Sequence, residues 1–283
     1  MKVQKIENTI KIKEYTFLVL IDFSECSYKA LKYAISLAKE TGGKIHLFHV
    51  GEINKITQSE NALVIRKRIA EGSIIIREKL KSIVEIIQQE NIAVSSAFSY
   101  GNEQDEIENQ IELINPDITV IGRRKKRLNY RGKITNYLLN QYAGCVLIGG
   151  NKETFHAKTK ISIACNNSTI SKSNITIVNG LHSFVDSTLS IINIVKESNT
   201  PVLTNYSTLF TGNKERLSYA FIVNINIAEG LAEHIEKKQI NLFCIGRSKD
   251  TNWILNRFFG RGSTATTIVD KVEVPIVILS NAN

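Results

Sequence analysis

Long apolar runs are missing from this sequence, and so are the clusters of cysteine and histidine that mark disulfide frameworks or metal sites. The chain of 283 residues has four cysteines and five histidines. No two cysteines have the spacing of a metal clamp or a CxxC redox pair, which favours buried free thiols in a reducing compartment. His46 and His49 stand three apart in one strand-like run, so they point to opposite faces and cannot share an ion. The sequence therefore predicts no metal site.

Membrane segments and catalytic motifs are also missing. The apolar run nearest the N-terminus, Phe17 to Ile21, is far too short to cross a bilayer. A secretory signal would need a longer apolar core and a small-residue cleavage site, so a cytoplasmic protein with no membrane contact is expected. Neither a GxxxxGK[ST] phosphate loop nor a nucleophile elbow occurs. The chain is therefore expected not to be an enzyme.

The composition is that of a globular protein with room for two ordinary domains. Hydrophobic residues make up 43% of the chain and charged residues 22%, and the formal net charge is +9. A basic chain of this kind favours anionic partners, namely nucleotides, nucleic acid or an acidic protein. The alternative interpretation is a basic surface that is simply solvated.

Strand and helix signals alternate along the first half of the chain. Short apolar runs, typical of strands covered on both faces, alternate with helical patterns that carry one apolar stripe. This alternation predicts a parallel, doubly wound sheet. The strands are expected at 16–22, 44–50, 92–99, 117–122 and 145–150, and the helices at about 24–41, 60–89, 103–113 and 132–142.

The second half repeats this plan in shorter form. The clearest echo sets INPDITVIGRRKK (114–126) against KKQINLFCIGRSKD (237–250), where Gly122 matches Gly246. NNSTISKSN (166–174) lacks a clean helix pattern, and 196–217 is predicted to be loop. A polar linker near 151–159 divides the chain into domains 1–153 and 154–283. Strands are expected at 160–165, 189–195, 220–225 and 274–279, with a helix at 227–238.

The stretch DFSECSYKALKYAISLAKETGGKIHLFHV (22–50) resembles the opening of universal stress protein domains. The resemblance covers nearly all of 16–150 and is weaker over 158–280. It implies an α/β fold with two Rossmann-like domains of the adenine nucleotide alpha hydrolase-like type, the second abbreviated. Each would hold a five-stranded parallel sheet of order 3-2-1-4-5. It also implies that the last strands, near 145–149 and 275–279, pair within the chain as a pseudo-dimer, with a further dimer as an open alternative.

The resemblance also implies where a nucleotide would bind, because ATP-binding members hold it where the loops after strands one and four meet. In the first half Asp22 stands where the family has an aspartate near adenine and ribose, and Val50 where main-chain groups read the base edge. Gly122 matches the first glycine of the phosphate motif. Lys125 replaces the second glycine, and Gly132-Lys133 takes the Gly-Ser position only if the loop is shortened by three residues.

The second half departs from the motif in a complementary way. Asn166 replaces the aspartate, while Gly246 is kept and Lys249 again replaces the second glycine. Gly262-Ser263-Thr264 forms a helix-start and anion-binding signature, about three residues later than the family spacing. Each candidate also has a plain structural interpretation: Asp22 as a helix cap, the glycines as turns, and the lysines as solvated turn residues.

Five consecutive basic residues follow Gly122, namely Arg123, Arg124, Lys125, Lys126 and Arg127. One hypothesis is a loop that attracts an anionic ligand or an acidic protein surface. Nucleic-acid binding is the weaker hypothesis, because Tyr130 is the single aromatic residue interleaved with these charges.

Together these patterns leave two main hypotheses for function. The first is a non-catalytic stress-response regulator or interaction scaffold, with degenerate nucleotide sites and no bound cofactor. The alternative is a sensor that binds ATP or AMP. Motif counting favours the scaffold, because neither half keeps every element of the nucleotide site.

Overall fold

One continuous β-sheet runs through the protein, in a computed structural model that describes residues 14–52, 62–124, 132–150, 154–165, 172–195, 217–223, 227–246 and 264–280. The described strands lie in the order β3-β2-β1-β4-β5-β10-β9-β6-β7-β8. Each half thus has the predicted order 3-2-1-4-5, and the α/β fold is confirmed. The predicted division between residues 153 and 154 stays a prediction.

The elements of the first half follow the sequence-based ranges to within two residues at most ends. Helices alternate with strands, as predicted for a doubly wound sheet. The elements are β1 (Thr16–Leu20), α1 (Glu25–Thr41), β2 (Lys44–Glu52), α2 (Ala62–Gln89), β3 (Val94–Gly101), α3 (Glu103–Ile114), β4 (Ile118–Ile121), α4 (Lys133–Asn140) and β5 (Val146–Ile148).

The second half has the same order of strands along the chain. All strand pairs within it are parallel. Its described elements are β6 (Ile161–Cys165), α5 (Lys172–Ser183), β7 (Leu189–Val195), β8 (Leu217–Val223), α6 (Ile227–Lys238), β9 (Leu242–Ile245), α8 (Thr264–Lys271) and β10 (Ile276–Ile278).

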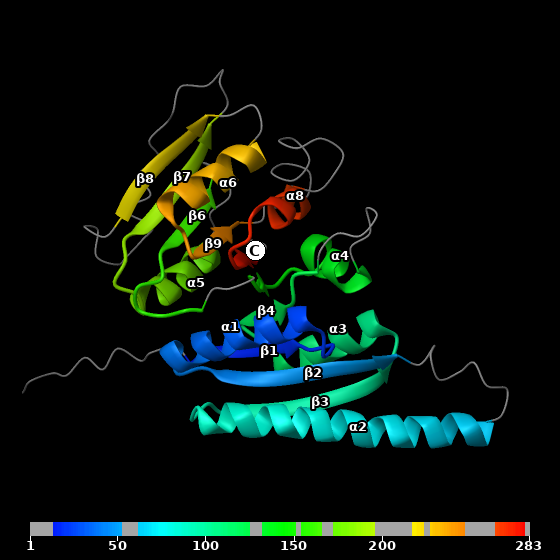
Figure 1. Ribbon diagram of the computed structural model, residues 1–283. Helices are drawn as coiled ribbons and strands as arrows, with labels where there is room; N and C mark the ends of the chain where they lie inside the picture. Colours follow the sequence, from blue (N-terminus) through cyan, green and yellow to red (C-terminus); the bar gives the residue numbers. More distant parts are fainter. Residues whose placement is uncertain are drawn as a thin grey trace, which may run out of the picture.

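The two halves join where β5 and β10 pair antiparallel. Val277 lies opposite Leu147, and the pairing of last strands that the resemblance implied within the chain is confirmed. Gly150 packs so closely at this junction that an added Cβ would lie 2.5 Å from the Cδ atom of Pro275. Figure 1 shows the first half, blue to green, below the second half, yellow-green to red.

Helix α1 shows how local signals set an element that borders the candidate site. The Ser24 hydroxyl accepts a hydrogen bond from the backbone N–H of Ser27 and caps the helix N-terminus. Gly42 ends the helix in the left-handed region at φ 63°. Its apolar stripe is fully buried, so packing against the sheet reinforces the capped ends; the stripe consists of Ala30, Leu31, Ala34, Leu37 and Ala38.

Three expectations need correction or stay open. Helix α5 occupies 172–183, where no helix was predicted, because its buried residues Ile175, Val178 and Leu181 begin only after the polar stretch. Of the thiols expected to be buried, Cys145 and Cys244 are buried but Cys26 is half-buried. The predicted loop at 196–217 lies outside the described residues except for Leu217, so the abbreviation of the second half stays a prediction.

None of the described helices is both long and apolar enough to cross a membrane.

Candidate ligand cleft

A cleft opens at the carboxyl ends of β1 and β4, where the strand order changes direction. Crevices at such switch points are the usual ligand sites of open parallel sheets. The cleft encloses about 640 Å³, counted with the solvent at its mouth. It brings together six of the predicted residues of the first half: Asp22, Val50, Gly122, Arg124, Gly132 and Lys133.

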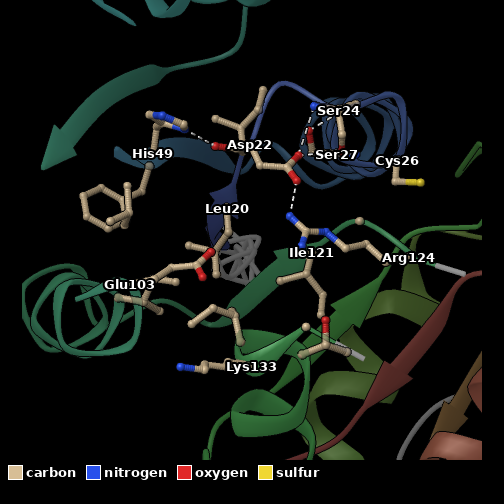
Figure 2. Close-up of a pocket in the computed structure, with 18 residues that line it drawn as sticks. Leu20, Asp22, Ser24, Cys26, Ser27, His49, Glu103, Ile121, Arg124 and Lys133 are labelled. Carbon is tan, nitrogen blue, oxygen red and sulfur yellow. Dashed lines mark hydrogen bonds and ion pairs between the residues drawn. The ribbon is translucent and has the colours of Figure 1, made fainter. Parts of the chain in front are cut away.

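Asp22 is held on both carboxylate oxygens. Its Oδ1 accepts hydrogen bonds from the backbone N–H of Ser24 at 3.0 Å and from the Ser24 hydroxyl at 2.6 Å. Its Oδ2 accepts from the Arg124 guanidinium (Figure 2). Burial alone raises the pKa of Asp22, but the hydrogen bonds from Ser24, Ser27 and Arg124 outweigh it and hold the pKa well below its usual range. Asp22 is therefore charged at neutral pH.

Arg124 crosses the cleft from the loop after β4. Its guanidinium reaches the loop after β1, and its side chain stays 53% exposed. Burial lowers the pKa of Arg124. The nearby carboxylate of Asp22 and the more distant Glu103 raise the pKa by more than burial lowers it, so the net shift is upward. The ion pair thus ties together the two loops between which a ligand would lie.

The neighbouring Arg123 points away from the cleft into the second half. Its Nε donates to the carbonyl of Gly149 at 3.1 Å, and its terminal nitrogens donate to three carbonyls of the second half: those of Val269, Val272 and Val274. Val269 lies in the last turn of α8, whose carbonyls lack partners within the helix. A cation at this end also complements the helix dipole. The prediction that Arg123 binds an external anion stays untested, but four of its N–H groups are already used.

Both glycines at the cleft have steric reasons for their identity. A Cβ on Gly122 would lie 2.7 Å from the carbonyl carbon of Cys26 and 2.7 Å from the backbone nitrogen of Ser27. The first motif glycine is therefore required by the close approach of β4 to α1, with or without a ligand. Gly132 precedes α4 as its N-cap and provides no side-chain hydrogen bond there. The exposed side chain of Lys133 follows it at the cleft edge.

Several predicted residues lie outside the described part of the chain, so their roles stay predictions. These are Lys125, Lys126, Arg127, Lys249, Gly262 and Ser263. Gly246 is buried directly after β9, and α8 begins at Thr264, as the helix-start signature predicted. Neither observation tests a ligand role in the second half.

His49 and Glu103 are among the lining residues of the cleft that were not predicted from the sequence. The His49 Nδ1 lies 2.7 Å from the carbonyl oxygen of Ile21, and its ring lies 4.5 Å from that of Phe23. Glu103 opens α3 directly after β3. All parallel strands of a sheet have their carboxyl ends at the same edge. The position of His49 and Glu103 near the ends of β2 and β3 is therefore a sequence signal for the cleft, as it is for residues after β1 and β4.

No group of three or more potential metal-binding side chains gathers in the described ranges. The cleft instead presents a fixed ion pair, a second carboxylate and an exposed lysine around an apolar floor that includes Leu20 and Ile121. Such a lining can hold a small polar molecule by hydrogen bonds.

Comparison with known proteins places this fold. Residues 15–148 match the family model described as the universal stress protein family. No curated protein matches the chain. The chain is similar to the crystal structure of a universal stress protein from Archaeoglobus fulgidus DSM 4304, with 16% identity, coverage of 95% of this chain and 97% of that one, and a TM-score of 0.74. It is also similar to a functionally unknown protein from Pseudomonas aeruginosa PAO1, with 14% identity, coverage of 95% and 93%, and a TM-score of 0.62.

At these identities the likeness to solved structures shows a shared fold, and it extends over both halves of the chain. The family match itself covers the half that contains the cleft. Residues 15–148 of this chain therefore belong to the universal stress protein family, and the chain as a whole shares its fold with the solved universal stress protein from Archaeoglobus fulgidus.

Proposed function

We propose that this chain is a non-catalytic regulator of the stress response that acts as an interaction scaffold and does not hold ATP in the manner of the family's nucleotide-binding members. The observation that carries this proposal is the double engagement of Asp22, with Ser24 on one oxygen and Arg124 on the other. A ribose that uses this carboxylate has to displace contacts that already satisfy it. That displacement costs binding free energy.

The phosphate end of the cleft supports the same proposal. Gly122 is explained by its packing against Cys26 and Ser27, so its presence does not require a phosphate nearby. Lys125 stands where the second glycine of the motif would allow close backbone approach. The scaffold would act in the cytoplasm on a protein partner, and the basic sequence favours an acidic partner surface.

A second candidate function is a nucleotide sensor that binds ATP or AMP. It is favoured by one specific observation, the gathering of Asp22, Val50, Gly122 and Gly132 around a single cleft. In this alternative the Arg124 guanidinium leaves Asp22 and pairs with a ligand phosphate. Arginine suits that role because its planar donors match phosphate oxygens.

Native mass spectrometry of the purified chain and calorimetric titration with ATP and AMP separate the two functions. The scaffold predicts no co-purified nucleotide and no saturable binding at millimolar ligand. The sensor predicts saturable binding that is lost in Asp22→Ala. The matched control is Glu25→Ala, which removes an exposed carboxylate in the first turn of α1 that does not line the cleft. Binding that Glu25→Ala keeps and Asp22→Ala loses would overturn the scaffold proposal.

A further inference from the structure

Helix α2 carries most of the large apolar side chains that the described residues expose. Five of the eight lie on this one helix: Leu63, Val64, Ile74, Ile75 and Ile86. The buried face of α2 consists of other residues, Ile76, Leu80, Ile83 and Ile87. The exposed side chains are therefore not the edge of the core. Clustered exposed aliphatic residues of this kind mark an interaction surface.

Three of these residues form a straight line along the helix. Val64, Ile75 and Ile86 are spaced eleven residues apart and are 38%, 53% and 59% exposed. Because eleven residues make about three turns at 3.6 residues per turn, the three side chains share one face. At about 1.5 Å per residue the line is roughly 33 Å long. Glu71 and Lys79 lie on the same face, four residues to either side of Ile75, and both are exposed.

This face, called here the α2 stripe (Val64, Glu71, Ile75, Lys79 and Ile86), is self-complementary about Ile75. Reversal of the helix direction exchanges Val64 with Ile86, an apolar residue for an apolar one. The same reversal exchanges Glu71 with Lys79, a negative charge for a positive one. A pattern that matches its own reverse is what a two-fold symmetric interface requires.

We propose that the α2 stripe is an interface at which two copies of this chain associate through an antiparallel pair of α2 helices. Ile75 then lies on the two-fold axis against the partner's Ile75, and Val64 packs on the partner's Ile86. Glu71 faces the partner's Lys79, and the symmetry repeats this ion pair.

The place of α2 in the fold leaves this face open to a second molecule. Figure 1 shows α2 beyond β3, at the end of the molecule farthest from the second half. Within the stripe, Lys79 also contacts its own chain, with its Nζ 5.0 Å from the centroid of the Phe23 ring. The interface is distinct from the pairing of β5 with β10, which takes place within one chain.

Sedimentation equilibrium of the full chain over roughly a hundredfold range of concentration tests the proposal, since dimerisation follows mass action. The expected result is an average mass that rises from 31.8 kDa toward twice that value. Ile75→Glu places like charges on the two-fold axis and is expected to keep the chain at 31.8 kDa with an unchanged circular dichroism spectrum. The matched control is Leu113→Glu, which removes a 76% exposed leucine from α3 and is expected to leave association unchanged.

Charge reversal tests the antiparallel register itself. Glu71→Lys alone and Lys79→Glu alone each place like charges across the interface and are expected to weaken association several-fold. The double variant restores opposite charges and is expected to associate like the unchanged chain. Ile75→Cys, in a chain that also carries Cys26→Ser, is expected to form a disulfide between copies, because only a residue on the axis faces itself.

Four outcomes would overturn the proposal. They are a chain that stays monomeric at every concentration, a dimer that Ile75→Glu does not affect, an equal loss in Leu113→Glu, and a double charge reversal that fails to restore association. A monomeric chain that floats with anionic lipid vesicles, and loses this binding in Ile75→Glu, would assign the α2 stripe to a membrane surface instead.

Discussion

Arg123 and Arg124 are adjacent in the sequence, yet they belong to two different regions of the molecule. Arg123 lies at the junction of the halves, half-buried, with four backbone carbonyls as acceptors. Arg124 lies over the cleft, exposed, with Asp22 as its partner. A charge run that looks uniform in the sequence therefore contains one structural residue and one residue of the candidate site.

The difference arises from the end of β4. Ile121 is the last residue of the strand, and Gly122 lies against the start of α1. From this point the two following side chains extend in opposite directions. Removal of the first side chain should damage the assembly of the halves, whereas removal of the second should alter only the cleft.

Arg123→Ala should destabilise the chain by about 2–4 kcal/mol, because it leaves buried carbonyl groups without donors and removes the cation from the end of α8. Arg123→Lys should recover little of this loss, since an ammonium group cannot reach four acceptors in a planar arrangement. Denaturant unfolding of both variants measures the effect. A loss no larger than that of Arg124→Ala would refute the distinction between the two arginines.

Glycine replacement tests the backbone of the same two regions. In Gly150→Ala the new Cβ meets Pro275 at the junction, and in Gly122→Ala it meets the backbone of Cys26 and Ser27 beside the cleft. Overpacking of this kind typically costs about 1–3 kcal/mol. We expect both variants to be less stable in thermal unfolding, and only Gly122→Ala to change the cleft.

The control for this pair is Gly132→Ala, where the nearest atom to an added Cβ is the flexible end of Arg124 at 3.3 Å. It should be tolerated better than either of the other two. If Gly122→Ala were equally well tolerated, the packing explanation for the first motif glycine would be wrong, and a ligand role for that glycine would gain support.

The sheet is predictable from the sequence because its signals are local and repeated. The buried strands are continuous apolar runs in the sequence. The order of strands and helices occurs twice along the chain, and this repeat predicts both halves of the sheet. Helix α5 was missed because its apolar residues, Ile175, Val178 and Leu181, follow a polar stretch that obscures the start of the helix. A regular spacing of apolar residues predicts a helix or strand, whereas a spacing that a polar stretch interrupts does not.

The candidate site was predictable only in part. The ends of β1 and β4 pointed to Asp22 and Gly122, because the topology brings these loops together. The sequence could not reveal that Arg124 takes the second oxygen of Asp22, or that Arg123 turns toward α8, because both contacts link residues more than 100 positions apart. Pairings over such separations depend on the assembled fold and have no local signature.

Arg124→Ala should have the smallest effect on stability, below about 1 kcal/mol, because the ion pair that it removes is solvent-exposed. The lowered pKa of Asp22 means that its contacts stabilise the folded chain above the ordinary pKa of 3.8 and lose this effect as the pH falls below that value. The difference in free energy of unfolding between the unchanged chain and Arg124→Ala should therefore shrink as Asp22 becomes protonated, and also at high salt.

Urea unfolding at neutral and acidic pH measures this difference, and Asp22→Asn with the double variant completes the double-mutant cycle. A coupling between Asp22 and Arg124 that persisted unchanged in acid would show that the contact does not depend on the carboxylate charge.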